Sequence, residues 1–462
     1  MKSATGMNRY IRLPAIDFMR VIVGPSSSHT AGAHEIGLRM NEIIRNYPEK
    51  LSHVSVGLYN SLSFTGKGHM TDVAICAGLA GVPIGGVKDF SATFRSRKAL
   101  TIRAGGQRLT FNLSRHLVFE KRRHPMSGNI AVLRLYASGK KVGEHVFESI
   151  GGGRIKPQPQ RDVQGSLPLR FRYGNWATFS RRAMDWPGKL IDFVVRRDGA
   201  LTAESNTGIR HKMLERYLIM MEAVELGKAL RGFLPGRLTR YRSWALFKSL
   251  EEDSINYSGY APAAAAAVSE HNASMGMMVA APTAGGGGVL PGVLYDLRRK
   301  GIPLLKLVDS LFIASVIGQI IEHNACISGA KAGCTFEVGA AESMAAAAGI
   351  YALMEDRPGG KRNLLDLIEQ GAEMALEHSS GMPCDPVGGL VQIPCIERNI
   401  VKAGEAMTII GIVLSPNPYF RPRVGLDTMI ALAYEIGRRL PESHRETSMG
   451  GLAAAKLKPT QS

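Results

Sequence analysis

The pattern of apolar and polar positions divides the chain into two parts of different character. In the first part, residues 53–63 (HVSVGLYNSLS) and 130–138 (IAVLRLYAS) are rich in β-branched residues and partly alternate between apolar and polar positions, which predicts strands. Between them, residues 69–81 (HMTDVAICAGLAG) have the composition of a helix that stops at a glycine. Residues 145–155 (HVFESIGGGRI) indicate a strand that enters a glycine turn. The first part is therefore expected to be mixed α/β.

The second part has helical spacing over most of its length. From residue 211 onward Ala, Leu, Met and Glu dominate, and helices are predicted within residues 212–230, 261–297 (interrupted by glycines), 307–324, 337–354 and 427–440. We expect the fold class α+β, with an N-terminal mixed α/β domain (1–158), a variable connection (159–210) and an all-α domain (211–458). The Pro/Gln-rich residues 156–168 mark the end of the first domain.

Charge and hydropathy narrow the class of protein. The 462 residues include 57 Lys and Arg against 39 Asp and Glu, a formal net charge of +18. These basic residues are dispersed and accompany no nucleic-acid-binding motif, so we expect a solvated basic surface and no dedicated nucleic-acid binding. No segment is predicted to be apolar enough to span a bilayer, and the first twenty residues lack the apolar core of a secretory signal. A cytoplasmic protein without a membrane partner is the expectation.

The cysteines are few, and their number is odd, which favours free thiols over a disulfide framework. They are Cys76, Cys326, Cys334, Cys384 and Cys395. Cys384 and Cys395 each adjoin a proline in MPCDPVGGLVQIPCIERN (382–399), and Cys334 follows a glycine-rich break, where a loop could aim its thiolate at a shared point. Spacing alone leaves open both buried structural thiols and metal ligands, because zinc and common iron–sulfur sites use four ligands. Three thiolates would leave one iron of a four-iron cluster open to a substrate.

Seven motifs occur together along both parts of the chain. They are GPSSSHTAGA (24–33), SLSFTGKGHMTDVAICAGLAG (61–81), SIGGG (149–153), VAAPTAGGGGVLPGVL (279–294), GCTFEVG (333–339), CDPVGGLVQIPCIERN (384–399) and ETSMGGLA (446–453). In these motifs the chain resembles the single-chain, iron–sulfur-dependent L-serine dehydratases (L-serine ammonia-lyases) of bacteria, and the resemblance is weak only at about residues 169–210. It implies a lyase of amino-acid catabolism and gluconeogenesis that converts L-serine to pyruvate and ammonia. The all-α domain would then be the catalytic one.

The resemblance implies that three cysteines hold a [4Fe-4S] cluster. The positions that match the family's ligands are Cys334, Cys384 and Cys395. Cys76 is then a small core residue of a helix, and Cys326, where relatives usually have serine, is only close in sequence to the cluster loop. An iron without a cysteine ligand would act as a Lewis acid on the serine hydroxyl, while a base removes the Cα proton.

The resemblance also implies acid/base and substrate-binding residues. Lys67 and His69 in the turn TGKGHMTD, together with His124 in RRHPMSGN, are the candidates for acid/base catalysis. The expected substrate contacts are Ser26, Ser27, Ser28, His29 and Thr30 at the start of a helix, and Thr283, Asn324 and Ser328 near the glycine-rich loops. A helix cap at residues 26–30 and local turn bonds in the second group are the alternatives. Relatives have an asparagine close behind the histidine that matches His124, and here it is displaced to Asn129 or lost.

Several departures from the family motifs leave the substrate open. Lys331 and Thr335 stand where relatives commonly have glutamate and glutamine, Glu342 replaces a frequent cysteine or serine, and Met449 replaces an arginine. The last residues, KLKPTQS, include no cysteine, whereas several relatives end in a cysteine-bearing tail. L-Serine is the expected substrate. The alternatives are another β-substituted amino acid, such as threonine or a biosynthetic intermediate, and a non-catalytic amino-acid-binding paralogue. A homodimer is expected because related enzymes often form one.

Overall fold

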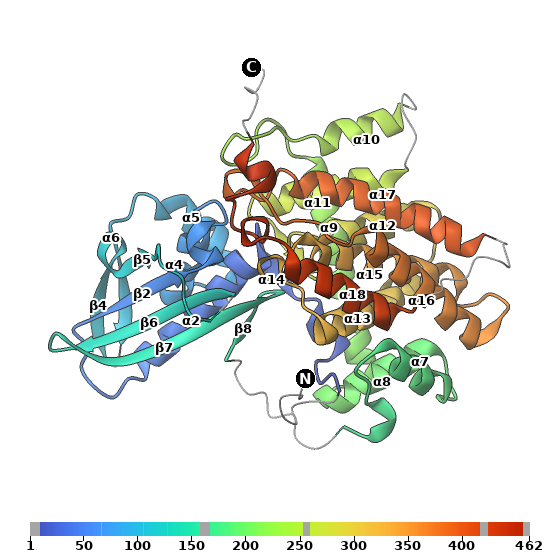
Figure 1. Ribbon diagram of the computed structural model, residues 1–462, viewed down its shortest axis with the longest axis horizontal. Coiled ribbons are helices and arrows are strands. Elements are labelled where there is room, and N and C mark those ends of the chain that lie inside the picture. Colours follow the sequence, from blue (N-terminus) through green and yellow to red (C-terminus); the bar gives the residue numbers. More distant parts are fainter. Residues whose placement is uncertain are drawn as a thin grey trace.

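The protein consists of a strand-containing N-terminal part and a larger helical part that lie end to end (Figure 1). The computed structural model describes residues 10–65, 67–104, 106–126, 128–157, 167–252, 259–415 and 424–455. The predicted fold class, a mixed α/β domain followed by a mostly helical one, is confirmed.

A five-stranded sheet forms the centre of the N-terminal part. Its order is β5-β2-β6-β7-β8, with bounds β5 (Leu117–Phe119), β2 (His53–Tyr59), β6 (Asn129–Ala137), β7 (Lys140–Gly151) and β8 (Arg154–Lys156). Strand β2 pairs in parallel with β5 and antiparallel with β6. Val54, Val56 and Leu58 lie on one face of β2, because alternate residues share a face, and they are buried in one apolar cluster with Ile36 and Leu133.

Two helices pack on this sheet and cross each other closely. They are α2 (Gly32–Arg45) and α4 (Thr71–Leu79), and a Cβ added at Gly37 or Gly78 would lie 2.3 Å from a backbone oxygen of the other helix. The remaining elements of this part are α3 (Ser61–Phe64), α5 (Val87–Phe94), α6 (Leu113–His116) and the hairpin β3 (Ala99–Ala104) to β4 (Gln107–Asn112). Cys76 of α4 is fully buried in the same cluster, so it is a core thiol.

Two long helices form the centre of the helical part: α13 (Leu304–Asn324) and α15 (Val338–Met354). Around them lie α1 (Ala15–Phe18), α7 (Trp176–Met184), α8 (Leu190–Thr202), α9 (Asn206–Lys228), α10 (Ser243–Glu251), α11 (Tyr260–Ala273), α12 (Val289–Arg299), α14 (Gly329–Ala332), α16 (Gly360–His378), α17 (Cys395–Leu414) and α18 (Leu426–Arg439). Helix α15 is buried from Val338 to Ala352, and its alanines and glycines let neighbouring helices approach it from several sides.

Helix α13 is more apolar than the sequence analysis allowed. Among the described residues it is the one helix long and apolar enough to cross a membrane by length and composition alone, so the prediction that no segment qualifies was wrong. Its apolar window is 78% buried inside the protein, and its side chains belong to the main cluster of the helical core. A helix that is apolar on all sides is expected in such a position.

Residues 159–210, predicted as a variable connection, include two helices of the helical core. Residues 159–166 lie outside the described residues, whereas α7 and α8 pack through Phe179 and Phe193, whose rings are 5.8 Å apart. The buried carboxylate of Asp198 accepts hydrogen bonds from the backbone N–H groups of Ala15 and Ile16 at 2.8 Å. The helical core therefore takes residues from both sides of the α/β part in the sequence.

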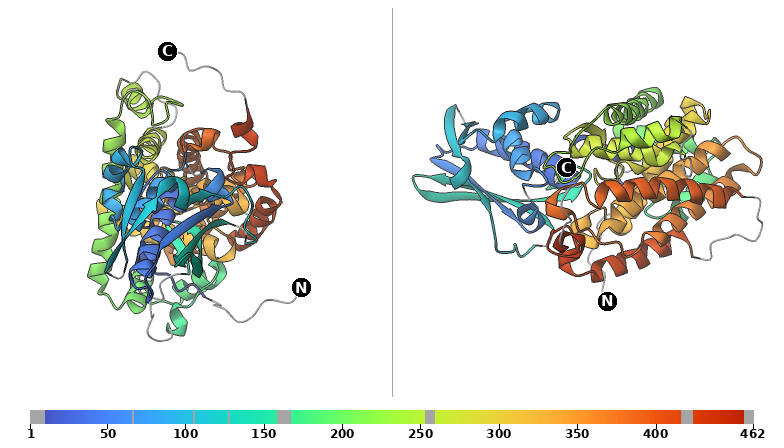
Figure 2. Two further views of the ribbon diagram at one scale, coloured as in Figure 1. Left: turned by 90° about the vertical axis from the view of Figure 1, so that its left-hand side faces the viewer. Right: turned by 90° about the horizontal axis from the view of Figure 1, so that it is seen from above.

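The N-terminal part and the helical part contact each other through irregular segments that lie between the sheet and the helix bundle (Figure 2). Strand β1 (Val21–Val23) pairs antiparallel with β9 (Met277–Val279) of the helical part, and a π-helix, η1 (Ser27–Ala31), follows β1 directly. The carboxy-terminal residues 442–454 also reach this junction, because Cys384 forms an isolated bridge with Arg445 and Ser61 of the N-terminal part donates to the backbone oxygen of Glu446.

Candidate active site

Three cysteines from three separate segments converge at the junction. Cys334 begins the 3-10 turn η4 (Cys334–Phe336), Cys384 lies in the extended segment after α16, and Cys395 is the first residue of α17. The backbone sets the first two side by side, because Cys334 N–H donates to Met382 at 2.8 Å. On its other side, Cys384 N–H donates to His444 at 2.8 Å and Glu446 N–H donates to Cys384 at 2.7 Å.

Cys334, Cys384 and Cys395 form no disulfide bonds, and each of their pKa values depends on a neighbouring thiol of the group. The Cys384 thiol is hydrogen-bonded to the Cys334 sulfur, and this bond, followed by the charge of Arg398, lowers the pKa of Cys334 to about 6. The same bond and burial raise the pKa of Cys384, while burial and then the charge on Cys334 raise the pKa of Cys395. One thiolate is thus favoured at neutral pH, and thiolates are the form that binds metal.

Arg398 is the cation of the site and ties its segments together. It lies one turn after Cys395, and its guanidinium donates to Pro383 at 2.7 Å and to the Asp385 carboxylate at 2.9 Å. Asp385 in turn accepts from the backbone N–H of Leu452 at 2.9 Å. The motif CIERN therefore supplies both a thiol and the guanidinium that stabilises a thiolate nearby.

Two buried carboxyl groups adjoin the cysteines. Sγ of Cys384 lies 3.4 Å from Oε2 of Glu337, and Glu337, Cys384 and Glu446 each place a ligand atom within 4.8 Å of the others. Burial, then the charge of Glu446, raises the pKa of Glu337 well above its usual value, and burial raises the pKa of Glu446 to about 8. Both carboxyl groups are therefore largely protonated at neutral pH, because a dry site disfavours their charged forms.

The space around this group is tight at Gly329. A Cβ added there would lie 2.4 Å from Oε2 of Glu337 and 2.9 Å from Sγ of Cys384. Gly329 is the first residue of the short helix α14, which follows α13 after a short connection. A glycine is required here for the loop that carries Cys334 to approach Cys384.

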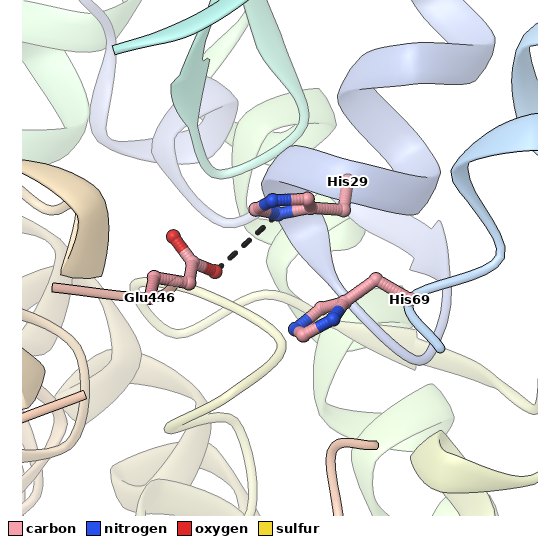
Figure 3. A group of neighbouring side chains, drawn as sticks. All are labelled: His29, His69 and Glu446. Carbon is pink, nitrogen blue, oxygen red and sulfur yellow. Dashed lines mark ion pairs between the residues drawn. The ribbon is translucent and has the colours of Figure 1, made fainter. Parts of the chain in front are cut away.

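Glu446 lies between Cys384 and two histidines of the N-terminal part. Figure 3 shows its side chain beside those of His29 and His69. Nδ1 of His29 lies 3.3 Å from Oε1 of Glu446, and the rings of His29 and His69 have centroids 4.6 Å apart. Nε2 of His29 lies 2.9 Å from the Ser61 hydroxyl, whereas Nδ1 of His69 is buried and has no hydrogen-bond partner among the described residues. Burial lowers the pKa of His29 well below its usual value and that of His69 to about 4, so both rings are neutral at neutral pH.

The predicted segment 26–30 is brought into this group, and part of it serves local structure. The Ser26 hydroxyl caps the π-helix by accepting from the backbone N–H of His29 at 3.1 Å. Thr30 donates its hydroxyl to the backbone oxygen of His69 at 2.8 Å, which fixes the turn that carries this histidine. The Ser28 hydroxyl lies 3.0 Å from Nδ1 of His29, and Ser27 is also buried.

The structure does not bring Lys67 and His124 into the buried group. Lys67 is exposed, although His69 two residues later is buried. His124 is half-buried, its ring lies 5.2 Å from that of Tyr59, and its Nδ1 accepts from the backbone N–H of Met126 at 3.2 Å. Asn129 is different, because its amide is buried and has no partner among the described residues. It pairs in the sheet with Ser149, whose hydroxyl donates to Ser28 at 2.8 Å.

The second predicted group of substrate contacts divides in the same way. Thr283 is buried in the glycine-rich loop, where its hydroxyl accepts from Gly286 at 3.4 Å, and Ser328 is buried immediately before Gly329. Asn324 is exposed at the end of α13, and its amide donates to Gly174 and Ile320 at 2.7 and 2.9 Å. Local bonding therefore accounts for Asn324.

Three of the residues that depart from the family motifs form specific contacts in the structure. Lys331 lies 2.7 Å from Glu148 of β7, and Thr335 donates its hydroxyl to Ser379 at 2.8 Å. Glu342 is fully buried 3.0 Å from Lys402. Met449 is half-exposed, and the tail residues 456–462 lie outside the described part of the chain.

Four residues of this site were missed by the sequence analysis: Ser61, Glu337, Arg398 and Glu446. Each lies inside a motif that had been singled out, namely SLSF, GCTFEVG, CIERN and ETSMGGLA. A charged or hydroxyl residue within such a motif was the available signal. The sequence alone does not show that these residues lie close together, because Ser61 and Glu446 are 385 residues apart in the chain.

Comparisons with known proteins cover both parts of the chain. A family model described as the serine dehydratase beta chain matches residues 14–160, and one described as the serine dehydratase alpha chain matches residues 138–453. The chain is 33% identical to L-serine dehydratase 2 of Escherichia coli (strain K12), over 96% of this chain and 98% of that protein. It is 31% identical to the L-serine dehydratase of Helicobacter pylori (strain ATCC 700392 / 26695), over 95% and 98%, and 32% identical to that of Streptomyces coelicolor, over 96% of this chain.

Proposed function

Because the chain belongs to the serine dehydratase family, with the regions of the alpha and beta chains joined in one polypeptide, we propose that it deaminates L-serine to pyruvate and ammonia. The observation that carries the proposal is the position of Glu446, which has ligand atoms within 4.8 Å of Cys384 and of the neutral His29 and His69, with Cys334 hydrogen-bonded to Cys384. The names of the relatives, which are similar over almost the full length, support L-serine as the substrate.

We further propose that Cys334, Cys384 and Cys395 hold a [4Fe-4S] cluster. The donor set fits such a group: three buried or half-buried thiols come from three separate segments, one is hydrogen-bonded to another, and a guanidinium lowers the pKa of Cys334. Bound there, the cluster would supply a Lewis acid for the serine hydroxyl at an iron without a cysteine ligand. The remaining steps fall to side chains of this chain.

His69 is the best-placed base for the Cα proton. It is buried, its ring is neutral at neutral pH, and its Nδ1 makes no hydrogen bond within the described residues. A neutral imidazole nitrogen without a protein partner can accept a proton from a bound substrate. The hydroxyl of Thr30 holds the backbone of His69 in place at 2.8 Å.

Glu446 is the best-placed acid for the departing hydroxyl. Its pKa is raised to about 8, so it carries a proton at neutral pH, and Oε2 is buried with no partner among the described residues. Loss of water needs one proton on the hydroxyl and removes one from Cα. Glu446 gives its proton to the hydroxyl, and His69 takes the proton from Cα. Because a ring nitrogen of His69 and a carboxyl oxygen of Glu446 lie within 4.8 Å of each other, the proton on His69 can pass back to Glu446 after the reaction. The aminoacrylate product then tautomerises and hydrolyses to pyruvate and ammonia.

Asn129 and the hydroxyls of residues 26–28 are proposed to bind the substrate. The Asn129 amide is buried without a partner among the described residues, which is costly unless a ligand satisfies it. It stands opposite Ser149, which is bonded to the Ser28 backbone, so it adjoins the π-helix that carries His29.

The test is anaerobic reconstitution with iron and sulfide, followed by assays of metal content and pyruvate release. We expect about four irons per chain with a broad visible absorbance, and pyruvate from L-serine at a higher kcat/KM than the corresponding product from L-threonine. Cys384→Ser should lower both iron content and activity, while Cys76→Ser, in the apolar core of the other part, should leave iron content unchanged. Pyruvate release by iron-free protein would refute the cluster, and a preference for threonine would refute the substrate.

A further inference from the structure

A cavity of about 430 Å³ lies at the junction, beside the loop that leads to Cys334. Its walls come from residues 10–13, from β7 and β8, from the end of α13 and the residues after it, and from Lys331 and Tyr434. Its volume is in the range of small-molecule sites in proteins. None of the residues to which we assign catalysis or metal binding line it, so it needs an explanation of its own.

The lining of this cavity is strongly basic. Four cationic side chains, Arg12, Arg154, Lys156 and Lys331, face one carboxylate, that of Glu322. Arg154 is paired with Glu322 and Lys331 with Glu148, whereas Arg12 and Lys156 have no acidic partner among the described residues. A concave site with an excess of one charge concentrates ligands of the opposite charge.

Arg154 supplies a second, independent observation. Its side chain is only 9% exposed, and its Nε is buried without a hydrogen-bond partner among the described residues. An unsatisfied donor on a buried guanidinium is costly, and a carboxylate or phosphate oxygen is the acceptor that matches it best. From the charge and this donor, we propose that the cavity binds a small organic anion that carries carboxylate or phosphate groups.

The position of the cavity couples it to the proposed active site. Ile327 lines the cavity, and two residues later Gly329 lies against Glu337 and Cys384. At the other end of this segment, Lys331 lines the cavity while its backbone oxygen accepts from Arg445, the neighbour of Glu446, at 3.3 Å. An anion in the cavity therefore contacts both ends of the segment that holds Gly329 in place. We expect it to act as an effector of turnover, and this second step rests on the proposed function.

Binding can be tested on the full chain without a cluster and without turnover. Isothermal titration with malonate, succinate and inorganic phosphate should give saturable binding of at least one probe, and the choice between dicarboxylate and phosphate identifies the ligand class. The double variant Arg12→Gln/Lys156→Gln should weaken this binding by about tenfold or more, since both side chains are exposed cations of the lining. Lys140→Gln removes an equally exposed cation outside the cavity and should leave binding unchanged.

A variant of opposite sign sharpens the test. Glu322→Gln removes the one carboxylate of the lining and releases Arg154, so it should tighten binding of the same probe, with thermal unfolding used to verify the fold. The absence of saturable binding by all three probes, or binding that neither the double variant nor Glu322→Gln alters, would overturn the proposal.

Kinetics then separate an effector site from the route of the substrate. In reconstituted enzyme the bound probe should change kcat for L-serine, and Arg12→Gln/Lys156→Gln should abolish that change while keeping the activity measured without the probe. Inhibition that is purely competitive with L-serine and equal in wild type and double variant would assign the probe to the active site instead. Binding measured without turnover remains valid even if L-serine is not the substrate.

Discussion

Nδ1 of His29 lies 3.3 Å from Oε1 of Glu446, and this contact joins the N-terminal part to the cysteine-bearing part. The Ser61 hydroxyl donates to the backbone oxygen of Glu446, so it accepts from Nε2–H of His29. His29 then presents an unprotonated Nδ1, and the carboxyl group facing it is the donor. The pKa of Glu446, raised to about 8, and the lowered pKa of His29 agree with a neutral hydrogen bond rather than an ion pair.

The variant Glu446→Gln tests the assignment of this proton to the Glu446 carboxyl group. The amide can still donate to Nδ1 of His29, so we expect a folded protein with nearly unchanged KM. It cannot release a proton to the leaving hydroxyl, so kcat should fall by roughly 10²- to 10⁴-fold, the usual contribution of a general acid. Anaerobic assays of pyruvate release provide the measurement, with Glu435→Gln on the exposed surface of α18 as the control. Full activity in Glu446→Gln would assign the acid to another residue.

His69 and Lys67 were both predicted to act in catalysis, and the structure separates them. His69→Asn removes the proposed base and should lower kcat by roughly 10²-fold or more. Lys67 is exposed, so Lys67→Gln should change kcat by less than about tenfold, as expected for a charge in high dielectric. Steady-state kinetics on both variants decide between them. A larger loss in Lys67→Gln than in His69→Asn would reverse the assignment.

Glu342 predicts a pH dependence of stability away from the cysteines. Burial raises its pKa to about 7 against 4.5 for an unfolded glutamate, even though Lys402 lies 3.0 Å away. Because the folded state holds this proton more tightly, the stabilising contribution is complete below the unfolded pKa and is lost as the pH rises through the folded one. The shift corresponds to about 3 kcal/mol between about pH 4.5 and pH 7.

Urea unfolding of wild type and Glu342→Gln, at several pH values from about 5.5 to 8, measures this contribution. The wild-type free energy of unfolding should fall relative to that of the variant as the pH rises, because glutamine does not titrate. A pH-independent difference between the two proteins would show that Glu342 is ionised throughout this range.

The sequence predicted the parts of this site that are fixed by local pattern. The three cysteines stand in segments rich in glycine and proline, and the structure brings Cys334 and Cys384 side by side. Segment 26–30 was predicted to contact the substrate, with a helix cap as the alternative, and in the structure Ser26 does cap the π-helix. The partners of these residues depend on how the two parts of the chain dock, and no periodicity encodes that docking. Glu446 acquires its raised pKa only because folding buries it beside Cys334.

Fold-level errors have the same origin. Residues 307–324 were predicted to form a helix, and no segment was predicted to be apolar enough to span a bilayer, yet α13 is buried on nearly all sides and so has no polar face to interrupt it. The sequence analysis assigned the dispersed basic residues to a solvated surface, but in α8 Arg197 is fully buried, and so is its neighbour Asp198. They are satisfied by the N-terminal segment, where Arg197 donates to Ile11 at 2.6 Å. A charged residue signals exposure only when no distant backbone group is available to pair with it.

Gly329→Ala provides the most direct test of how the cysteine loop is held. The backbone of Gly329 has a negative φ, so alanine meets no conformational strain there, and space alone opposes it. Its Cβ would lie 2.4 Å from Oε2 of Glu337 and 2.9 Å from Sγ of Cys384, which must move apart. We expect less iron per chain after reconstitution, faster loss of the visible absorbance in air, and a lower kcat. Gly411→Ala is the matched control, because Gly411 lies on the exposed face of α17 with nothing within 4 Å of its Cβ position. That variant should leave iron content unchanged and stabilise the protein by up to about 1 kcal/mol through helix propensity.

Equal iron content in Gly329→Ala and Gly411→Ala would contradict this prediction. It would mean that Cys384 can shift without loss of the metal, and that the close approach at Gly329 serves packing rather than metal binding.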